Sequence, residues 1–377
     1  MKNGKCLILY CDTGGGFKSP SIAVKKEFEK RGYEVTLLDF AHDLKSKFTD
    51  RLIKGTWRLC LRIPLIFKVF LFLADQRLLI KLLPKLMFIT RKKIYDLIKK
   101  ENYDIIFSTH FASTQLIADI KSKYKLKIPT FAYDADVFNS QYVWFNNNLD
   151  KIFVPTKMAY DGMLERNAEE NKLQLVGFPL DDKFLKSKGR SALGKKLNLP
   201  DKFTILLMAG GEGIGKLDDY VDVLLNLNED IHIIVICGKN KKIYNKLDEL
   251  SKKHSNLSIF GFVDNMHEFY QCSDVVVGKG GFNFLFESIY LEKPMIINSY
   301  MANEEIGVRY VIDNNFAWLV KGTKEFSDLI KKILNDKSII ESAKERMAKA
   351  KFNPGTEEMV DYMIDFSNFK KSRKHSG

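Results

Sequence analysis

Residues 5–33, KCLILYCDTGGGFKSPSIAVKKEFEKRGY, contain the pattern that sets the class of fold. An apolar run ends in three consecutive glycines, and an amphipathic helical pattern follows. A glycine turn between a strand and a helix leaves backbone N–H groups at the helix N-terminus, where the helix dipole favours an anion. Glycine is also the usual residue of turns, so the loop predicts a close approach without identifying what approaches.

Short β-rich runs alternate with helical patterns along the whole chain, as in YDIIFSTH (103–110) and FTILLMAGG (203–211). Such alternation predicts parallel sheets covered by helices on both faces. We therefore predict an α/β protein with two doubly wound, Rossmann-like domains and a ligand cleft at the carboxyl ends of their strands. The predicted parts are domains at 1–182 and 203–352, a polar, lysine-rich linker at 183–202, and a C-terminal helix with a basic tail at 353–377.

The composition excludes several classes of protein. The chain has 377 residues and five cysteines, and no two cysteines form a C-x-x-C pair. This usage indicates a reducing compartment and buried thiols rather than disulfides or zinc ligands. The N-terminal apolar run is too short for a signal peptide, so we predict a protein of the cytoplasmic side. No recognised nucleic-acid module is visible, and we predict no nucleic-acid partner.

The basic residues are concentrated in one segment. Residues 41–100 carry 15 Lys and Arg against four Asp, which is +11 of the total formal charge of +13. Charged residues interrupt every apolar run of this segment well before the roughly 18 residues that a membrane span needs. Leu, Phe and Trp mixed with Lys and Arg favour an interfacial helical segment at 44–100, lying on an anionic membrane. The alternative is a helical hairpin that covers the first domain with its lysines solvated. The candidate membrane residues are Trp57, Arg58, Arg62, Phe70, Phe72, Lys81 and Lys85.

Four glycine-bearing loops each follow a predicted strand: DTGGGFKS (12–19), MAGGEGIG (208–215), GFVDN (261–265) and GKGGFNFLFES (278–288). Several such loops in one domain, with Glu287 on the following helix, predict a nucleotide site with phosphates at a helix end and a carboxylate for ribose hydroxyls. A dinucleotide site in the first half is the alternative, because Asp39 stands where a ribose-binding acid belongs. However, GGGFKS lacks the G-x-G-x-x-G spacing.

With these loops the chain resembles the diacylglycerol glycosyltransferases, typified by plant monogalactosyldiacylglycerol synthase and its bacterial glucosyl counterparts. More distantly it is similar to the N-acetylglucosaminyltransferase that makes lipid II. The resemblance covers about residues 5–320 and rests on DTGGG, STH (108–110), DKIFVPT (150–156), VGFPL (176–180), LLMAGGEGIG (206–215), GFVDNM (261–266), GKGGFNFLFES and INSYMANEEIG (297–307). It implies glycosyltransferase family 28, a GT-B fold, a UDP-sugar in the C-terminal domain and a lipid acceptor in the N-terminal one. The 44–100 segment falls where this family carries its membrane-docking region.

The resemblance also implies roles for individual residues. Phe262 and Val263 would flank the uracil, Glu287 would bind ribose, and Glu304 and Glu305 would reach the hexose hydroxyls. Gly211, Gly213, Gly281 and Asn283 would line the diphosphate, and the remaining donor-binding candidates are Glu212 and Phe284. No cofactor is implied beyond the UDP-hexose itself, and no metal, because helix N-termini can stabilise a leaving diphosphate.

Four positions depart from the family pattern. Phe17 stands where the family has a histidine implicated in catalysis or acceptor binding. Asn283 and Phe284 replace a glycine and a phosphate-contacting threonine, and Glu304 replaces a glutamine. Phenylalanine cannot accept a proton, so the base must lie elsewhere.

Two residues at strand ends remain as candidate bases, Asp12 first and His110 second. The structural alternatives are that Asp12 caps the glycine turn and that His110 is a polar residue satisfied at a strand end. Gly14, Gly15, Gly16 and Phe17 form the predicted acceptor and phosphate loop.

Asp134 and Asp136 form a D-x-D pair, which in other glycosyltransferases holds a metal on the sugar diphosphate. Asp134 matches a family aspartate of the acceptor domain, so a metal is the less favoured interpretation.

The prediction for function is an inverting transfer of a hexose from a UDP-sugar to a membrane lipid hydroxyl, on diacylglycerol or its monoglycosyl product. The protein would be bound peripherally to the cytoplasmic face of the membrane. One alternative is a transferase of the same fold that acts on a polyprenyl-linked acceptor. Another is a degenerate family member that binds nucleotide sugar or lipid with little turnover, which Phe17 and Phe284 favour.

Overall fold

The computed structural model describes residues 3–44, 47–208, 217–350 and 352–375. The chain divides into two compact units. Unit 1 consists of Met1–Asp181 together with Asn353–Gly377, and unit 2 is Asp182–Phe352. Each unit is built around its own parallel sheet, which confirms the predicted pair of doubly wound α/β domains.

The sheet of unit 1 has six parallel strands in the order β2-β1-β3-β4-β5-β6. Its central strands are buried on both faces because helices cover both sides, which is why they read as unbroken apolar runs. The strands are β1 (Gly4–Tyr10), β2 (Tyr33–Asp39), β3 (Ile105–Ser108), β4 (Thr130–Tyr133), β5 (Lys151–Val154) and β6 (Leu173–Leu175).

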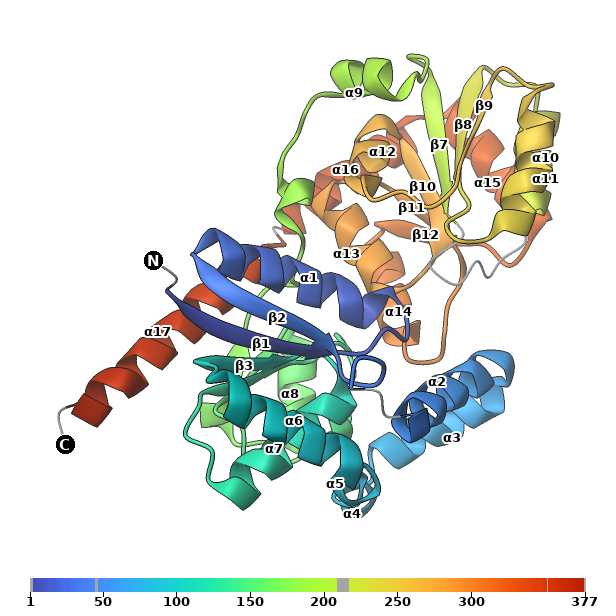
Figure 1. The fold of residues 1–377 in the computed structure, drawn as a ribbon. Helices are drawn as coiled ribbons and strands as arrows, with labels where there is room; N and C mark the ends of the chain where they lie inside the picture. Colours follow the sequence, from blue (N-terminus) through green and yellow to red (C-terminus); the bar gives the residue numbers. More distant parts are fainter. Residues whose placement is uncertain (1–2, 45–46, 209–216, 351, 376–377) are drawn as a thin grey trace. The chain divides into compact units, whose positions relative to one another are not determined.

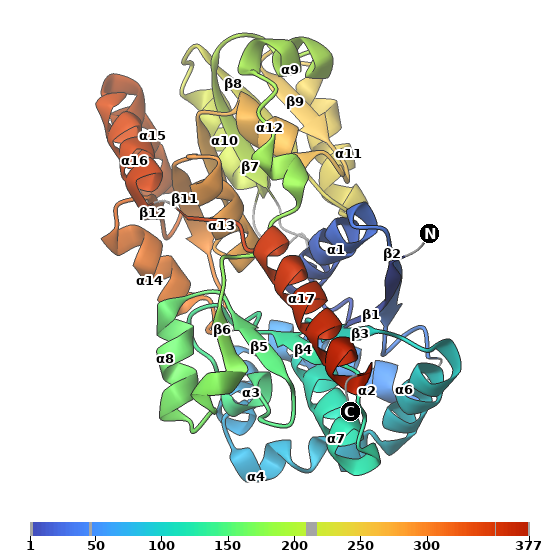
Figure 2. The same cartoon turned by 90° about the vertical axis from the view of Figure 1, so that its left-hand side faces the viewer.

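Helices cover both faces of this sheet. Helices α1 (Gly15–Lys30) and α17 (Thr356–His375) pack against each other on one face, while α6 (Phe88–Glu101) and α7 (Phe111–Tyr124) cover the other (Figures 1 and 2). Helix α8 (Lys157–Glu165) packs beside β5 and β6, and short 3₁₀ turns occur at η1 (Tyr142–Trp144) and η2 (Glu170–Lys172).

The C-terminal helix α17 is an integral part of unit 1. Its Met359 and Met363 are fully buried, and Thr356 Oγ1 donates a 2.6 Å hydrogen bond to the carbonyl of Leu180. The basic residues that we predicted as a tail continue this helix to His375, and Lys370 donates to Asp150 at 2.5 Å.

The basic segment of unit 1 contains α2 (Lys47–Arg62), α3 (Pro64–Ala74), α4 (Arg77–Ile80) and α5 (Leu83–Leu86), followed by α6. Helices α2 and α3 lie side by side (Figure 1). Pro64 begins α3, where its missing N–H has no intrahelical partner to lose. In the part of the chain that the structure describes, none of the helices has the length and apolar character needed to cross a membrane.

Unit 2 repeats the architecture, with all six strands parallel in the order β12-β11-β10-β7-β8-β9. The strands are β7 (Phe203–Met208), β8 (Ile231–Ile236), β9 (Leu257–Phe260), β10 (Val275–Lys279), β11 (Met295–Ser299) and β12 (Ala317–Leu319). The helices are α9 (Arg190–Leu197), α10 (Leu217–Asn226), α11 (Lys241–Ser251), α12 (Met266–Cys272), α13 (Phe282–Tyr290), α14 (Glu305–Asp313), α15 (Thr323–Asn335) and α16 (Ser338–Ala350).

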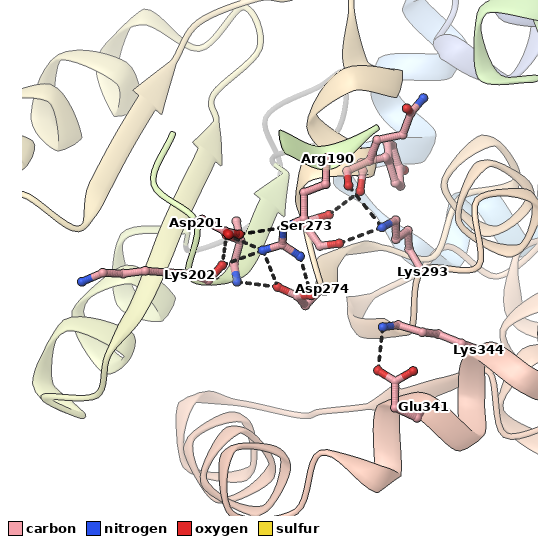
Figure 3. A network of polar contacts seen from close by, with 11 residues as sticks. Arg190, Asp201, Lys202, Ser273, Asp274, Lys293, Glu341 and Lys344 are labelled. Atoms are coloured by element: carbon pink, nitrogen blue, oxygen red, sulfur yellow. Dashed lines mark hydrogen bonds and ion pairs between the residues drawn. The ribbon is translucent and has the colours of Figure 1, made fainter. Parts of the chain in front are cut away.

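The segment that we interpreted as a linker, residues 183–202, is packed within unit 2. It contains the end of the 3₁₀ turn η3 (Asp182–Leu185) and helix α9, which lies against α12. Arg190 anchors it by donating to both carboxylate oxygens of Asp274, at 2.6 and 2.9 Å (Figure 3). The bidentate geometry fixes the guanidinium, so this stretch is part of the domain rather than a tether.

Lys293 lies near the same network, at the C-terminal end of α12 (Figure 3). Its ammonium donates to the carbonyl of Ser273 at 2.8 Å and, at 3.4 Å, to that of Gln271. Burial lowers the pKa of Lys293 to about 8. The side chain satisfies carbonyls at a helix C-terminus, which is a structural task.

Strand order reverses between β1 and β3 in unit 1 and between β7 and β10 in unit 2. In open α/β sheets ligands bind outside the carboxyl ends of the strands at such reversals. The glycine loop of residues 12–16 follows β1, and Gly280 and Gly281 follow β10, so the fold puts a glycine loop at each reversal.

Candidate functional site

The glycine loop of unit 1 faces open space. Gly14 is the N-cap of α1 at φ 124°, a conformation that few residues other than glycine adopt, and no side chain caps the helix. A Cβ added at Gly14 or Gly16 would meet no atom within 4 Å. Thr13 Oγ1 is buried and has no hydrogen-bond partner among the described residues. This helix N-terminus is therefore suited to an anionic or hydroxyl-bearing group.

Asp12 lies immediately before the glycines. Its carboxylate is 42% exposed and accepts a 2.8 Å hydrogen bond from Lys18 Nζ. The ion pair restrains the carboxylate while leaving it accessible, so Asp12 can take a proton from a hydroxyl brought to the loop.

Asp39 is occupied by the turn after β2. Its carboxylate accepts the backbone N–H of Asp12 at 3.2 Å, of Ala41 at 3.0 Å and of His42 at 3.2 Å. An acid with these three contacts is a turn-stabilising residue, which argues against the dinucleotide alternative.

His110 lies in the core beside the same loop. It is 1% exposed and caps α7, with Nδ1 accepting the N–H of Ala112 at 3.2 Å. Burial lowers the pKa of His110 to about 3, so the ring is neutral at pH 7. A neutral imidazole that accepts at Nδ1 carries its proton on Nε2. His110 therefore fits a helix cap and hydrogen-bond donor better than a base.

Phe17 belongs to an aromatic strip that we define as Phe17, Phe111, Trp144, Phe70, Phe67 and Trp57. Ring centroids lie 6.0 Å apart between Phe17 and Trp144, and 5.7 Å apart between Trp144 and Phe111. The strip continues from Phe111 to Phe70 at 5.8 Å, to Phe67 at 6.3 Å and to Trp57 at 6.1 Å. A chain of packed aromatic rings, in which Trp144 and Phe67 are buried, thus connects the glycine loop with α2 and α3.

The D-x-D pair is directed into the protein. Asp134 is fully buried and accepts hydrogen bonds from the N–H of Asp136 at 3.0 Å and from the hydroxyl of Ser140. Burial raises the pKa of Asp134 to about 7. Within the described ranges no three His, Cys, Asp or Glu side chains form a group that could hold a metal ion.

In unit 2 the loop after β7 lies outside the described residues, and with it the predicted donor residues Gly211, Glu212 and Gly213. The loop after β10 lies within the described residues. Gly281 is the N-cap of α13 without a side-chain cap, and a Cβ at Gly280 would lie 2.5 Å from the side chain of Val308. Gly280 therefore allows α14 to approach the loop closely.

The side chains on α13 line the same edge. Asn283, Phe284 and Glu287 are half-buried, and the ring of Phe284 lies 3.1 Å from the position of a Cβ on Gly278. Burial, followed by the charge of Glu287, raises the pKa of Tyr270 well above its usual value. Glu287 thus lies beside a neutral phenol. Because it is only half-buried, its carboxylate is accessible to hydroxyl groups of a ligand.

The GFVDN loop presents an aromatic ring. Phe262 is 69% exposed, with Lys239 Nζ 5.8 Å from the centre of its ring, while Val263 is half-buried. The base of the loop is fixed because Glu268 accepts a 2.8 Å hydrogen bond from Asn265. A fixed loop with an exposed ring suits a planar base.

The two predicted sugar-reading acids differ in their surroundings. Glu304 is 7% exposed, accepts Lys279 Nζ at 2.7 Å and accepts the N–H of Met301 at 2.6 Å. Glu305 is half-exposed and pairs with Arg309 one helical turn later.

Sequence reasoning missed three basic residues beside the predicted site: Lys18, Lys239 and Lys279. Lys18 directly follows Phe17 and Lys279 directly precedes Gly280, so both were visible within the glycine motifs. Asp12, the partner of Lys18, lies in the same motif, but the partner of Lys279 was not visible, because Glu304 lies 25 positions away.

The two units together have the α/β architecture of GT-B glycosyltransferases, as solved relatives show. MurG of Acinetobacter baumannii superimposes with a TM-score of 0.63 at 13% identity, over 96% of this chain and 99% of that one. The glycotransferase of kitacinnamycin gives 0.64 at 13% identity, over 97% of this chain and 100% of that one.

The sequence comparisons then define the family. Residues 20–180 match the monogalactosyldiacylglycerol (MGDG) synthase family, and residues 204–361 match the glycosyltransferase family 28 C-terminal domain. The chain belongs to glycosyltransferase family 28. Monogalactosyldiacylglycerol synthase 1 of Arabidopsis thaliana is 27% identical over 346 residues, covering 86% of this chain and 64% of the plant protein's length. The processive diacylglycerol beta-glucosyltransferase of Bacillus pumilus is 22% identical over 379 residues, covering 99% and 97% of the two chains.

Proposed function

We propose that this protein is an inverting glycosyltransferase that moves a hexose from a UDP-sugar to a hydroxyl of a membrane lipid, diacylglycerol or its monoglycosyl product. The observation that carries the proposal is that the two halves match the two parts expected of such an enzyme, a diacylglycerol-type N-terminal domain and a family 28 C-terminal domain. Relatives named for transfer to diacylglycerol in both plants and bacteria support the same substrate class.

The donor would lie at the carboxyl edge of the unit 2 sheet. Phe262 offers an exposed ring for the uracil, and Glu287 offers a half-buried carboxylate for the ribose. The uncapped N-terminus of α13 would stabilise the leaving diphosphate. These groups supply charge stabilisation from the protein itself.

The acceptor hydroxyl would lie at the glycine loop of unit 1. Asp12 takes the proton from this hydroxyl, and the oxygen attacks the anomeric carbon of the hexose. The bond from that carbon to the diphosphate oxygen breaks, UDP leaves, and the configuration is inverted. Lys18 holds the Asp12 carboxylate at 2.8 Å, and the half-buried ring of Phe17, which packs on Trp144, offers the apolar part of the lipid a contact.

The helices α3 to α5 would bind the membrane surface. Twelve of the large apolar side chains that are exposed lie between residues 59 and 89, and the most exposed are Leu65 (70%), Phe72 (65%), Leu78 (78%) and Leu86 (64%). Such a concentration of exposed apolar side chains in one segment of a folded chain supports an interaction site. Exposed Arg58, Lys81 and Lys85 add attraction to anionic lipids.

Two predicted membrane residues have a different place. Trp57 and Phe70 are half-buried members of the aromatic strip, so they connect the membrane-facing helices with the loop rather than enter the lipid. The side chain of Arg62 lies outside the described residues. The proposal also includes attachment of the protein to the cytoplasmic face of a membrane through helices α3 to α5.

Membrane binding is tested by cosedimentation with vesicles that contain anionic lipid, because attraction to anionic lipids adds to the binding of basic apolar helices. The triple variant Leu65→Asn, Phe72→Asn, Leu78→Asn should lose binding at least tenfold, because three exposed apolar side chains leave the interface. The matched control replaces Met158 and Leu175, which are 50% and 42% exposed elsewhere in unit 1, and should bind like the wild type. Equal binding of the triple variant would contradict the docking surface.

The reaction is tested by UDP release on vesicles with and without diacylglycerol, using UDP-glucose, UDP-galactose or UDP-N-acetylglucosamine. Release with at least one donor should depend on diacylglycerol, and Asp12→Asn should lower kcat by about 10²- to 10⁴-fold while UDP still binds. UDP release that does not depend on diacylglycerol but increases when a polyprenyl phosphate is added would favour the alternative acceptor. UDP binding without release on any lipid would favour a binding protein with little turnover.

A further inference from the structure

A nearly buried ion pair borders the proposed donor site. Lys279 ends β10 and Glu304 precedes α14, and their charged atoms lie 2.7 Å apart. The side chains are 24% and 9% exposed. The second carboxylate oxygen of Glu304 accepts the N–H of Met301 at 2.6 Å. Glu304 is therefore held from two sides and largely removed from water.

The pair lies against the glycine loop at the start of α13. A Cβ added at Gly281 would be 3.4 Å from Glu304 Oε1, and Gly281 is the uncapped N-cap of that helix. Gly280 allows Val308 of α14 to pack directly on the loop. The carboxylate thus adjoins the helix N-terminus to which we assign the diphosphate.

A carboxylate at this place opposes the binding of a diphosphate. Like charges a few ångströms apart repel strongly where water is largely excluded. Of the other acids nearby, Glu305 pairs with Arg309, and Glu287 lies beside the neutral phenol of Tyr270. Among the described side chains, Lys279 is the cation that contacts Glu304. It cancels the charge that would otherwise face the donor.

We propose that Lys279 is a positioning residue of the donor site, which forms with Glu304 one electrically neutral unit. The inference rests on the proposed use of a UDP-sugar. Glu304 then accepts hydrogen bonds from hexose hydroxyls, and Lys279 keeps it from repelling the diphosphate.

The test is the affinity for UDP and for each UDP-hexose, measured by calorimetry on the full chain. The variants are Lys279→Met, Glu304→Gln and the double variant. Lys279→Met should weaken UDP binding at least about tenfold, because it leaves an unpaired carboxylate beside the diphosphate. Glu304→Gln should bind UDP within about threefold of the wild type or more tightly, and the double variant should recover to the same range, as expected for coupled residues.

Lys246→Met is the matched control, because Lys246 also forms a 2.6 Å ion pair in unit 2, with Asp218, but its side chain is 63% exposed. It should leave UDP affinity unchanged. Melting temperatures of all variants report whether the fold is intact. If Lys279→Met does not fold, Glu304→Gln alone decides, and a tenfold loss of affinity in it contradicts the neutral unit.

Three results separate this inference from the proposed function. Wild-type affinity in Lys279→Met, or a double variant as weak as Lys279→Met, overturns the inference while the proposed function stands. A wild type that does not bind UDP overturns both. A wild type that binds UDP and shows the recovery, but does not act on diacylglycerol, supports the role of Lys279 and refutes the proposed acceptor.

Discussion

The ion cluster around Glu268 allows the most quantitative prediction. Glu268 is 1% exposed and accepts hydrogen bonds from Lys196 at 2.7 and 2.6 Å, from Lys188 at 3.2 Å and from Asn265 at 2.8 Å. Burial alone would raise the pKa of Glu268, but the hydrogen bonds and the lysine charges outweigh it and lower the pKa to about 2. The change is Glu268→Gln, which removes the charge and keeps the shape.

The magnitude follows from the pKa. A fall from 4.5 to about 2 corresponds to about 3 kcal/mol of stability, at ~1.4 kcal/mol per pH unit. The two lysine side chains are 55% and 56% exposed, and solvent screening reduces the figure to about 2 kcal/mol. Because the folded pKa lies below the unfolded one, this stability is complete above about pH 4.5 and is lost as the pH falls to about 2. At pH 3 less than half remains, about 1 kcal/mol.

The assay is urea denaturation of the wild type and Glu268→Gln at pH 7 and pH 3. The variant should be about 2 kcal/mol less stable at pH 7 and about 1 kcal/mol less stable at pH 3. Hydrogen exchange should quicken in residues 261–266, which Glu268 holds through Asn265. The control is Glu249→Gln. The side chain of Glu249 is 73% exposed and pairs with Lys252 at the surface, so this change should alter stability by less than about 0.5 kcal/mol. The same loss for Glu268→Gln at both pH values would refute the electrostatic reasoning.

Three further predictions follow from unit 1. Met363→Ala should cost about 2–5 kcal/mol in urea denaturation because Met363 is fully buried, and a loss below 1 kcal/mol would contradict the packing of α17. His110→Gln should leave the pH profile of kcat/KM unchanged between pH 6 and 8, since burial lowers the pKa of His110 to about 3, and a lost acidic limb in this variant would identify it as the base. Phe17→Ala should raise KM for the lipid several-fold while KM for the UDP-sugar stays the same, and the reverse pattern would remove Phe17 from the acceptor side.

The fold could be predicted because its signal is local. Parallel strands buried on both faces are apolar runs, and the structure has a strand at each of the two runs quoted above, Ile105–Ser108 and Phe203–Met208. The interpretation of residues 183–202 as a linker missed helix α9. This helix buries a single apolar residue, Leu193, so its hydrophobic pattern is weak. Arg190 and Asp274 hold that helix in place, and their pairing across 84 positions leaves no local pattern.

The candidate site could be predicted only in part. Strand ends and glycine loops located Asp12 and His110 at the same edge of the sheet, because the carboxyl ends of parallel strands meet there. What each residue does there depends on contacts from elsewhere in the chain. Burial among Phe17, Phe40 and Phe111 keeps His110 neutral, and Lys279 gives Glu304 a partner.

Transfer of a hexose to a lipid hydroxyl is best established by identifying the lipid product. The full chain would be incubated with anionic vesicles containing diacylglycerol and each UDP-hexose, and the lipids would be analysed by mass spectrometry and by the proton coupling at the anomeric carbon. We expect a hexosyl diacylglycerol with a β-linkage, formed from an α-linked donor, and none with Asp12→Asn. An α-linked product would contradict inversion, and the absence of any hexosyl lipid from protein that binds both UDP and vesicles would contradict the proposed activity.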